Sequence, residues 1–269
     1  MHAGSGRSGT MRLVAAGAIG LGLAAGPSAA EPPPEDTWDL AVVPYLWALA
    51  LQGETEVKGN TVEIDRGIID NLNDFQLGGM VLMDGRYRRF VALADGFFTR
   101  IGDNSGGPLL RRDATSTTII GDLKAGVRLL DTTTPWADSS APDAPRAVFD
   151  LLGGFRYWAV RTELETNGVT AQHFDKWKDW VDPLVGVRVG VGLTRTLNVS
   201  VIGDVGGFDM GNASELTWMV MPTLNWRPWE HWSFHAGYKH LKAERERPST
   251  NNELDFELTG PVLGVGYHF

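Results

Sequence analysis

The stretch "WVDPLVGVRVGVGL", residues 180–193, alternates between two kinds of residue with a period of two. One set is apolar and comprises Val181, Val185, Val187, Val189, Val191 and Leu193. The other set is mostly charged or glycine and comprises Asp182, Gly186, Arg188, Gly190 and Gly192, with Leu184 as its apolar exception. Because successive side chains of a β-strand point to opposite faces, the stretch predicts a strand with one apolar face.

The same alternation recurs along the chain, for example in "IIGDLKAGVRLL" (119–130), "VFDLLGGFRYW" (148–158) and "WSFHAGYKH" (232–240). Helical periodicity is almost absent, with "RGIIDNLN" (66–73) as the one short exception. We predict ten strands, at residues 38–51, 75–86, 90–101, 115–130, 147–162, 179–193, 197–209, 215–226, 232–244 and 253–269. The predicted fold is therefore all-β: a closed, antiparallel, up-and-down transmembrane β-barrel of about ten strands, with eight or twelve as alternatives.

The links between these strands alternate between long and short. The long links are 52–74, 102–114, 163–178 and 245–252, and the short ones are 86–89, 194–196 and 227–231. Transmembrane barrels have this asymmetry, with short turns at one end and longer loops at the other. Two links break the rule, because 131–146 is long and 211–214 is short. Residues 55–64 also predict a hairpin around Gly59-Asn60 that extends the first loop.

The N-terminus has the layout of a secretory signal peptide. Arg12 precedes a run of small apolar residues at 13–26, which is followed by "PSAA" and a polar segment. A transmembrane anchor would need about 20 apolar residues, so we predict a signal peptide at 1–30, a proline-rich lead-in at 31–37 and a barrel at 38–269. Met11 is an alternative start. The net charge of −9 and the lack of a basic stripe make nucleic acid an unfavourable partner.

Alternation alone does not say which face meets water, so a soluble barrel with inward valines is the alternative. The glycines on the polar face favour a narrow closed interior, and aromatic residues gather at the strand ends as they do at the two membrane interfaces. The predicted aromatic girdle comprises Trp38, Tyr87, Phe90, Phe98, Tyr157, Trp180, Trp226, Trp229, Trp232, Tyr267 and Phe269, although Trp180 falls on the polar side of its strand.

The last residues, "GVGYHF" (264–269), complete a family resemblance. With the signal peptide and the hairpin rhythm, they make the chain resemble the small outer-membrane β-barrel proteins of Gram-negative bacteria, in the broad OmpA-like and porin-like sense. Gly264, Tyr267 and Phe269 match the terminal assembly signal of that family, while Val262 stands where a polar residue is usual. The resemblance implies location in the outer membrane, lipid as surroundings, and the barrel-assembly machinery as partner of the C-terminal strand. We expect a monomer.

The polar faces of the strands predict a network of ion pairs that fills the interior, because charges in a low-dielectric wall are costly unless paired. Its predicted members are Asp84, Arg86, Asp95, Asp122, Lys124, Arg128, Asp150, Arg156, Asp182, Arg188, Asp204 and Lys239. A ten-strand barrel is narrow, which favours a largely plugged lumen and a structural or surface-interaction role. Unconnected pore-lining charges are the alternative interpretation of the same residues.

Two other functions remain open. One is a narrow channel for ions or small solutes. The other is a hydrolase at the rim, which would draw on His173, Asp175, Asp179 and Asp182; their spacing is unspecific, and we do not predict an enzyme. His231 and His235 would lie about 13 Å apart on a strand, too far to share a metal ion. No cofactor or metal site is predicted.

Overall fold

The computed structural model describes residues 38–57, 60–66, 75–107, 110–138, 141, 144–167, 172–247 and 252–269. The predicted signal peptide, the lead-in and most of 66–73 lie outside these residues. The strands are β1 (Trp38–Trp47), β2 (Ala50–Val57), β3 (Asn60–Arg66), β4 (Phe75–Tyr87), β5 (Phe90–Gly107), β6 (Leu110–Thr133), β7 (Arg146–Asn167), β8 (Gln172–Gly192), β9 (Leu197–Gly207), β10 (Leu216–Trp226), β11 (Trp232–Arg247) and β12 (Asn252–His268). The described part of the chain contains no helix that is long and apolar enough to cross a membrane.

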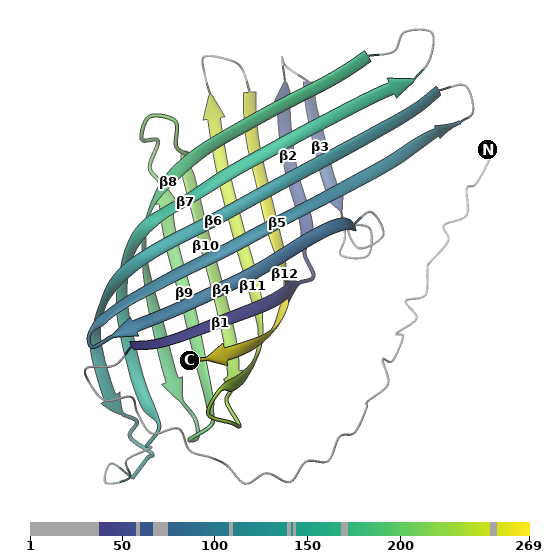
Figure 1. The fold of residues 1–269 in the computed structure, drawn as a ribbon. Coiled ribbons are helices and arrows are strands. Elements are labelled where there is room, and N and C mark those ends of the chain that lie inside the picture. Colours follow the sequence, from purple (N-terminus) through teal and green to yellow (C-terminus); the bar gives the residue numbers. More distant parts are fainter. Residues whose placement is uncertain are drawn as a thin grey trace, which may run out of the picture.

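The strands form one antiparallel sheet that closes on itself (Figure 1). Each strand from β4 to β12 pairs with its neighbour in sequence, and β1 pairs with β4 on one side and with β12 on the other. β1 and β2 lie end to end along β12, where Trp47 is opposite Val262 and Ala50 is opposite Thr259. β3 pairs with β2, and β4 pairs with β1. β3 and β4 therefore also share one strand position of the wall, so the twelve labelled strands occupy ten positions around the barrel. The predicted ten-strand, closed, up-and-down barrel is confirmed.

The strands at the long-loop end run further than the sequence predicted. The β5–β6 ladder extends to Gly107 opposite Leu110, and the β7–β8 ladder to Thr166 opposite Gln172, so much of the predicted loops 102–114 and 163–178 is strand. Their polar residues suggested loops, but an antiparallel ribbon satisfies its own backbone and needs no apolar face in water. In Figure 1 these hairpins project beyond the body of the barrel. We call this the hairpin end and the opposite one the short-turn end.

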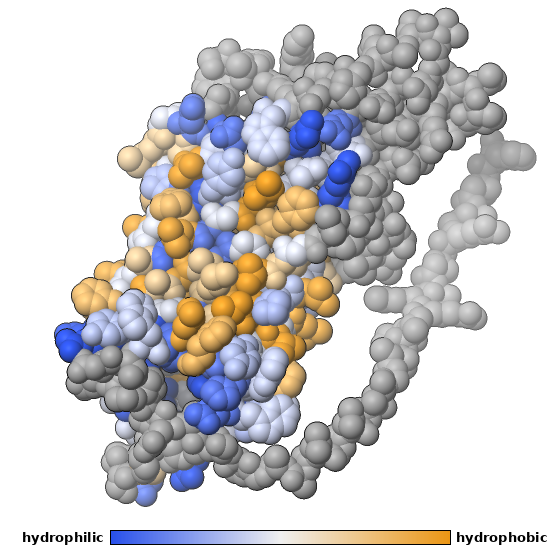
Figure 2. All heavy atoms as spheres, viewed as in Figure 1, coloured by the Kyte–Doolittle hydropathy of each residue, from blue (hydrophilic) through white to orange (hydrophobic). Residues whose placement is uncertain are grey.

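The outer surface of the wall is apolar around its middle. Valines and leucines of β6, β7 and β8, such as Leu123, Leu151 and Val185, are about half exposed. Figure 2 shows apolar residues across the middle of the visible face, with hydrophilic residues toward both ends. On β5 the outward positions run from Phe90 to Phe98, which matches the roughly 9–11 residues of a membrane-spanning strand.

The interior is mixed rather than wholly polar. β1, β5, β10 and β11 send apolar side chains inward, including Val43, Trp47, Phe97, Met219 and Leu241. The charged side chains come mainly from β6, β7, β8 and β9. Apolar and charged side chains therefore fill the barrel together, since Ile120, Trp158 and Ile202 of the strands that carry most charges also belong to the apolar core.

Candidate functional site

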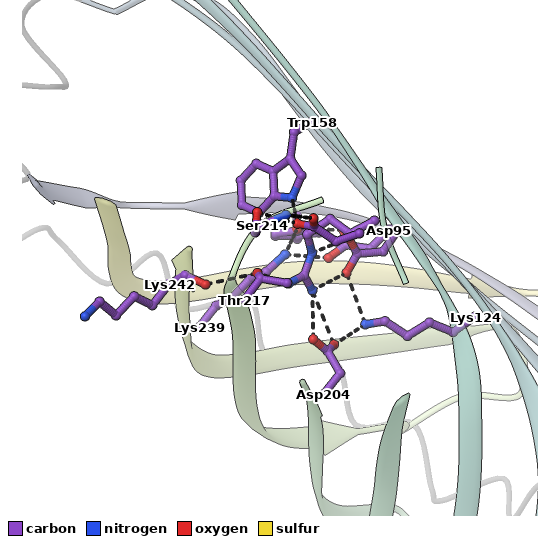
Figure 3. A network of polar contacts seen from close by, with 12 residues as sticks. Asp95, Lys124, Trp158, Asp204, Ser214, Thr217, Lys239 and Lys242 are labelled. Carbon is purple, nitrogen blue, oxygen red and sulfur yellow. Dashed lines mark hydrogen bonds and ion pairs between the residues drawn. The ribbon is translucent and has the colours of Figure 1, made fainter. Parts of the chain in front are cut away.

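Arg156 lies at the centre of the lumen, and its side chain is fully buried. It donates two parallel hydrogen bonds to the carboxylate of Asp122, Nε to Oδ1 and Nη2 to Oδ2, each of 2.7 Å. Nη2 also donates to Asp204 at 3.0 Å, and Nη1 donates to the hydroxyl of Thr217 at 3.1 Å. The Nζ of Lys124 lies 2.5 Å from Asp204 and 3.1 Å from Asp122. Two cations and two anions thus neutralise each other in a buried cluster (Figure 3).

This central cluster, Asp122, Lys124, Arg156 and Asp204, joins strands that are not neighbours. Lys124 is on β6 and Asp204 on β9, with two strands between them. A side chain at Gly186 on β8 would obstruct this contact, because a Cβ there would lie 2.9 Å from the Cβ of Asp204. Glycine at position 186 therefore leaves room for the side chain of Asp204.

A second pair lies beside the central cluster. Lys239 on β11 forms an ion pair with Asp95 on β5 and donates to the hydroxyl of Tyr45 at 3.0 Å. The Tyr45 hydroxyl in turn donates to Asp95 at 2.8 Å. The ammonium of Lys239 also lies 4.9 Å from the ring centroid of Trp47. Tyr45 was not predicted as a partner of Lys239, because opposite charge alone points to a carboxylate such as that of Asp95.

Toward the short-turn end, Asp150 is fully buried between two arginines. Arg188 donates to it at 2.7 Å, Arg128 donates at 2.8 Å, and Arg188 also reaches Asp84 at 2.5 Å. These contacts connect β4, β6, β7 and β8 across the lumen.

Arg86 reaches the Asp150 cluster through Asp131. It is 3.7 Å from Asp39 and 3.9 Å from Asp131, at the short-turn end. Asp131 also pairs with Arg128 and Arg146. A register shift between Arg128 and Leu130 brings Asp131 to the inner side, where strict alternation from Arg128 would place it outside. The sequence carries no clear signal for this bulge.

At the hairpin end, Asp182 is fully buried and accepts three hydrogen bonds. They come from the indole Nε1 of Trp158 at 2.6 Å and from the backbone N and the hydroxyl of Ser214, at 2.6 and 2.9 Å. Trp180 donates to the same hydroxyl at 2.9 Å. The link between β9 and β10, residues 208–215, contains the short link predicted at 211–214, and its buried residues Ala213 and Ser214 cover Asp182 at this end of the lumen.

The two tryptophan rings continue this cover. Trp158 and Trp180 stack with centroids 5.6 Å apart, the guanidinium of Arg245 lies 4.3 Å from the ring centroid of Trp180, and that of Arg156 lies 5.7 Å from Trp158. The prediction that Trp180 belongs to the outer aromatic girdle is wrong, because its side chain is inside and 3% exposed. Its parity in β8 is the signal that identifies it as an inner residue.

A hydrogen-bonded network of serine, histidine and asparagine side chains lies at the short-turn end of the barrel. Ser233 bonds the Nε2 atoms of both His235 and His268, at 2.8 and 2.9 Å, and the Nδ1 of His235 bonds Asn225 at 2.6 Å. These residues lie on β10, β11 and β12, so the network ties the last strand to its neighbours. Ser233 is buried, and a Cβ on Gly266 would lie 2.4 Å from its Oγ, so the serine is packed rather than presented to a substrate.

The free space beside the ionic clusters is small. Two cavities of about 10 Å³ each are lined in part by Asp95 and Asp122. A cavity of this size has room for about one water molecule. The side chains around these two cavities are therefore closely packed.

The other predicted girdle residues lie on the outer side of the wall. At the short-turn end Trp38, Phe90, Trp226, Trp229, Trp232, Tyr267 and Phe269 are exposed, and Tyr87 stacks on Trp38 at 5.0 Å. Phe98 and Tyr157 are partly buried at the other edge of the apolar band. Tyr267 packs edge-on against both Trp232 and Phe269, with centroids 5.2 and 5.0 Å apart. Of the predicted assembly signal, Gly264 lies opposite Tyr45 of β1, so the signal forms part of the closing seam.

Of the residues named for a rim hydrolase, the two whose side chains the structure describes, Asp179 and Asp182, do not lie together. Asp179 is exposed on the outer face of β8, whereas Asp182 is buried in the lumen with its oxygens occupied. The side chains of His173 and Asp175 lie outside the described residues. Within the described part of the chain, no three histidine, aspartate or glutamate side chains are grouped so as to hold a metal ion.

No protein-family model and no curated protein sequence matches the chain. Among solved structures, the chain is similar to the outer membrane protease OmpT of Escherichia coli, with a TM-score of 0.53 and 9% identity over 86% of this chain and 97% of that chain. It also matches the translocator domain of the autotransporter NalP of Neisseria meningitidis, with a TM-score of 0.44 and 12% identity over 87% and 89%. At such identities the likeness concerns the fold alone.

The fold and the apolar band define the class of protein: a small β-barrel of the bacterial outer-membrane type. A fold of this kind can carry many different functions, so the fold does not assign the function. The function must be argued from the lumen.

Proposed function

We propose that the protein is a non-conducting outer-membrane barrel with a structural or surface-interaction role. The observation that carries this proposal is the central cluster, in which Asp122, Lys124, Arg156 and Asp204 bond one another at almost fully buried positions. In a narrow barrel such contacts span the lumen and leave no passage between its walls.

The energetic argument is that an ion pathway would have to break this cluster. Each cavity beside it holds about one water, so a hydrated ion has no room to pass. Separating Arg156 from its carboxylates in a dry interior costs several kcal/mol, since neither partner regains full hydration. The cover over Asp182 and the network around Ser233 add blocks at the two ends.

The proposed orientation has the short turns in the periplasm and the hairpins outside. Short periplasmic turns and longer outer loops are usual in this class, and the predicted signal peptide would deliver the chain to the periplasm. Lipid would surround the apolar band, and the assembly machinery would bind the strand that carries Gly264, Tyr267 and Phe269. Export and a monomeric state belong to the same proposal. The hairpins β5–β6, β7–β8 and β11–β12 would then be the surface available to partners.

Conductance across a planar lipid bilayer tests the plug. The purified barrel should give no stable current steps, whereas a double variant, Lys124→Ala with Arg156→Ala, should give cation-selective steps because two acids then line a wider lumen. Arg161→Ala is the matched control and should remain silent, because Arg161 is on the same strand as Arg156 but its side chain is 43% exposed. Stable, salt-dependent steps from the unaltered protein would refute the plug and favour the narrow channel.

A second experiment tests the membrane placement. A folded outer-membrane barrel stays in detergent micelles and changes its gel mobility on heating, because only heat unfolds the closed sheet. A mature chain that stays soluble without detergent and shows no such change would contradict the proposal.

A further inference from the structure

The turn between β4 and β5 consists of two arginines. Tyr87 pairs with Phe90, so Arg88 and Arg89 form a two-residue hairpin loop. Such loops favour Asn or Gly because the backbone adopts positive φ, and Arg88 has a φ of 52°. A non-glycine residue in this region is strained, and strain of this kind is a reason to search for a function at the residue.

Three aromatic side chains surround this turn on the lipid-facing side. Trp38 lies opposite Tyr87, which lies opposite Phe90, so all three share one level of the wall. Trp38 and Phe90 are the more exposed, at 70% and 64%, and Trp38 stacks on Tyr87. The guanidinium of Arg88 lies 5.6 Å from the Tyr87 ring centroid. The turn therefore places two exposed cations just beyond an aromatic platform at the edge of the apolar band.

Arg88 and Arg89 are both exposed, so the turn presents two adjacent cationic side chains at the surface. The whole chain is acidic, so a pair of exposed adjacent arginines departs from its general charge. Arginine binds phosphate with two parallel hydrogen bonds, and aromatic rings favour the depth of lipid headgroups. Phosphate on a lipid is the ligand that satisfies both features.

We propose that Arg88 and Arg89, with Trp38, Tyr87 and Phe90, form a binding site for the headgroup of an anionic phospholipid in the leaflet at the short-turn end. The arginines bind the phosphate and the aromatic rings pack against the glycerol and upper acyl chains. This site rests on the membrane placement proposed above. It explains why the turn keeps arginine at position 88, where glycine would relieve the backbone.

Lipid retention measured by native mass spectrometry tests the site. The barrel is extracted from bilayers that contain equal amounts of phosphatidylglycerol and phosphatidylcholine, and the retained lipids are counted. We expect phosphatidylglycerol to be enriched, and the double variant Arg88→Gln with Arg89→Gln to reduce the enrichment at least about fivefold, as one interfacial charge implies. Replacing both arginines by lysine should preserve most of it.

Two variants make the result specific. Arg195→Gln removes an exposed arginine from the short turn at 194–196, which joins Leu193 and Leu197 rather than aromatic residues, and should change nothing. The double variant Arg88→Gly with Arg89→Gln should lose the enrichment and yet unfold at a higher urea concentration, because glycine relieves the strained backbone at position 88.

Two results would overturn the site: unchanged enrichment in the glutamine variant, or an equal loss in Arg195→Gln, which would indicate diffuse charge. If the membrane placement itself were wrong, the barrel would retain neither lipid, and that outcome differs from a loss of preference.

Discussion

Replacing Arg156 by alanine should destabilise the barrel more than any surface substitution. The change removes five hydrogen bonds: two to Asp122, two to Asp204 and one to Thr217. It leaves two buried carboxylates with Lys124 as the remaining cation, at 2.5 and 3.1 Å. The buried charge is then two negative against one positive.

The magnitude follows from this imbalance. Hydrogen bonds to charged groups contribute about 1.5–3 kcal/mol each, but Lys124 stays in place and water can enter the space left by the guanidinium. The net loss is therefore close to that of a broken buried ion pair, about 3–5 kcal/mol. Arg161→Ala is the matched control, because Arg161 is an exposed residue of the same strand that pairs with Glu163 at 2.9 Å, and its loss should cost about 0–1 kcal/mol.

Urea unfolding in lipid vesicles, followed by tryptophan fluorescence, measures both variants. Adding Asp122→Asn to Arg156→Ala should recover part of the loss, because it removes one of the unpaired charges, and the double-mutant cycle gives their coupling. A loss below about 1 kcal/mol for Arg156→Ala would refute the buried cluster, since only a well-hydrated site tolerates that change.

Three further predictions concern other layers of the lumen. Asp182→Asn should release the link 208–215, because the new amide nitrogen would face N–H and O–H groups whose hydrogen bonds the carboxylate now accepts. Proteolysis within that link should become faster. In single-tryptophan variants, lipids brominated on their acyl chains should quench Trp226 and leave Trp180 unquenched, since only Trp226 is on the outer surface. Gly266→Ala should cost about 1–3 kcal/mol in urea unfolding, because its Cβ would lie 2.4 Å from the Oγ of Ser233.

The alternation of residues predicted the wall of the barrel well, because both faces of a membrane-spanning strand restrict which residues they can carry. Lipid requires apolar residues outside, and the narrow interior requires glycine or paired groups inside. Outside the membrane neither face has to be apolar or paired, and the outer parts of β5 to β8 were therefore predicted as loops. Water accepts polar residues on either face there, and backbone pairing alone extends the hairpins.

The partners within the lumen were less predictable than the faces. Alternation puts Arg156, Asp122 and Asp204 on one side of the wall, but it does not say which of them meet. Arg156 and Asp122 are on adjacent strands, whereas Asp204 is two strands away from Arg156. That contact depends on the tilt and stagger of the strands, which hairpin patterns do not specify. The bulge before Leu130, which turns Asp131 inward, is equally absent from the pattern.

The width of the barrel decides whether the inner charges form a plug or line a pore. Lys124 and Asp204 are three strand positions apart and still meet at 2.5 Å, because ten strands enclose a space that two side chains can span. Barrel diameter grows about linearly with strand number, so the same residues in a 16-strand wall would face water instead of each other. The charged residues alone are therefore compatible with a channel. The strand number, which the alternating stretches of the sequence predict, sets the width of the barrel and so allows these charged residues to contact one another across the lumen.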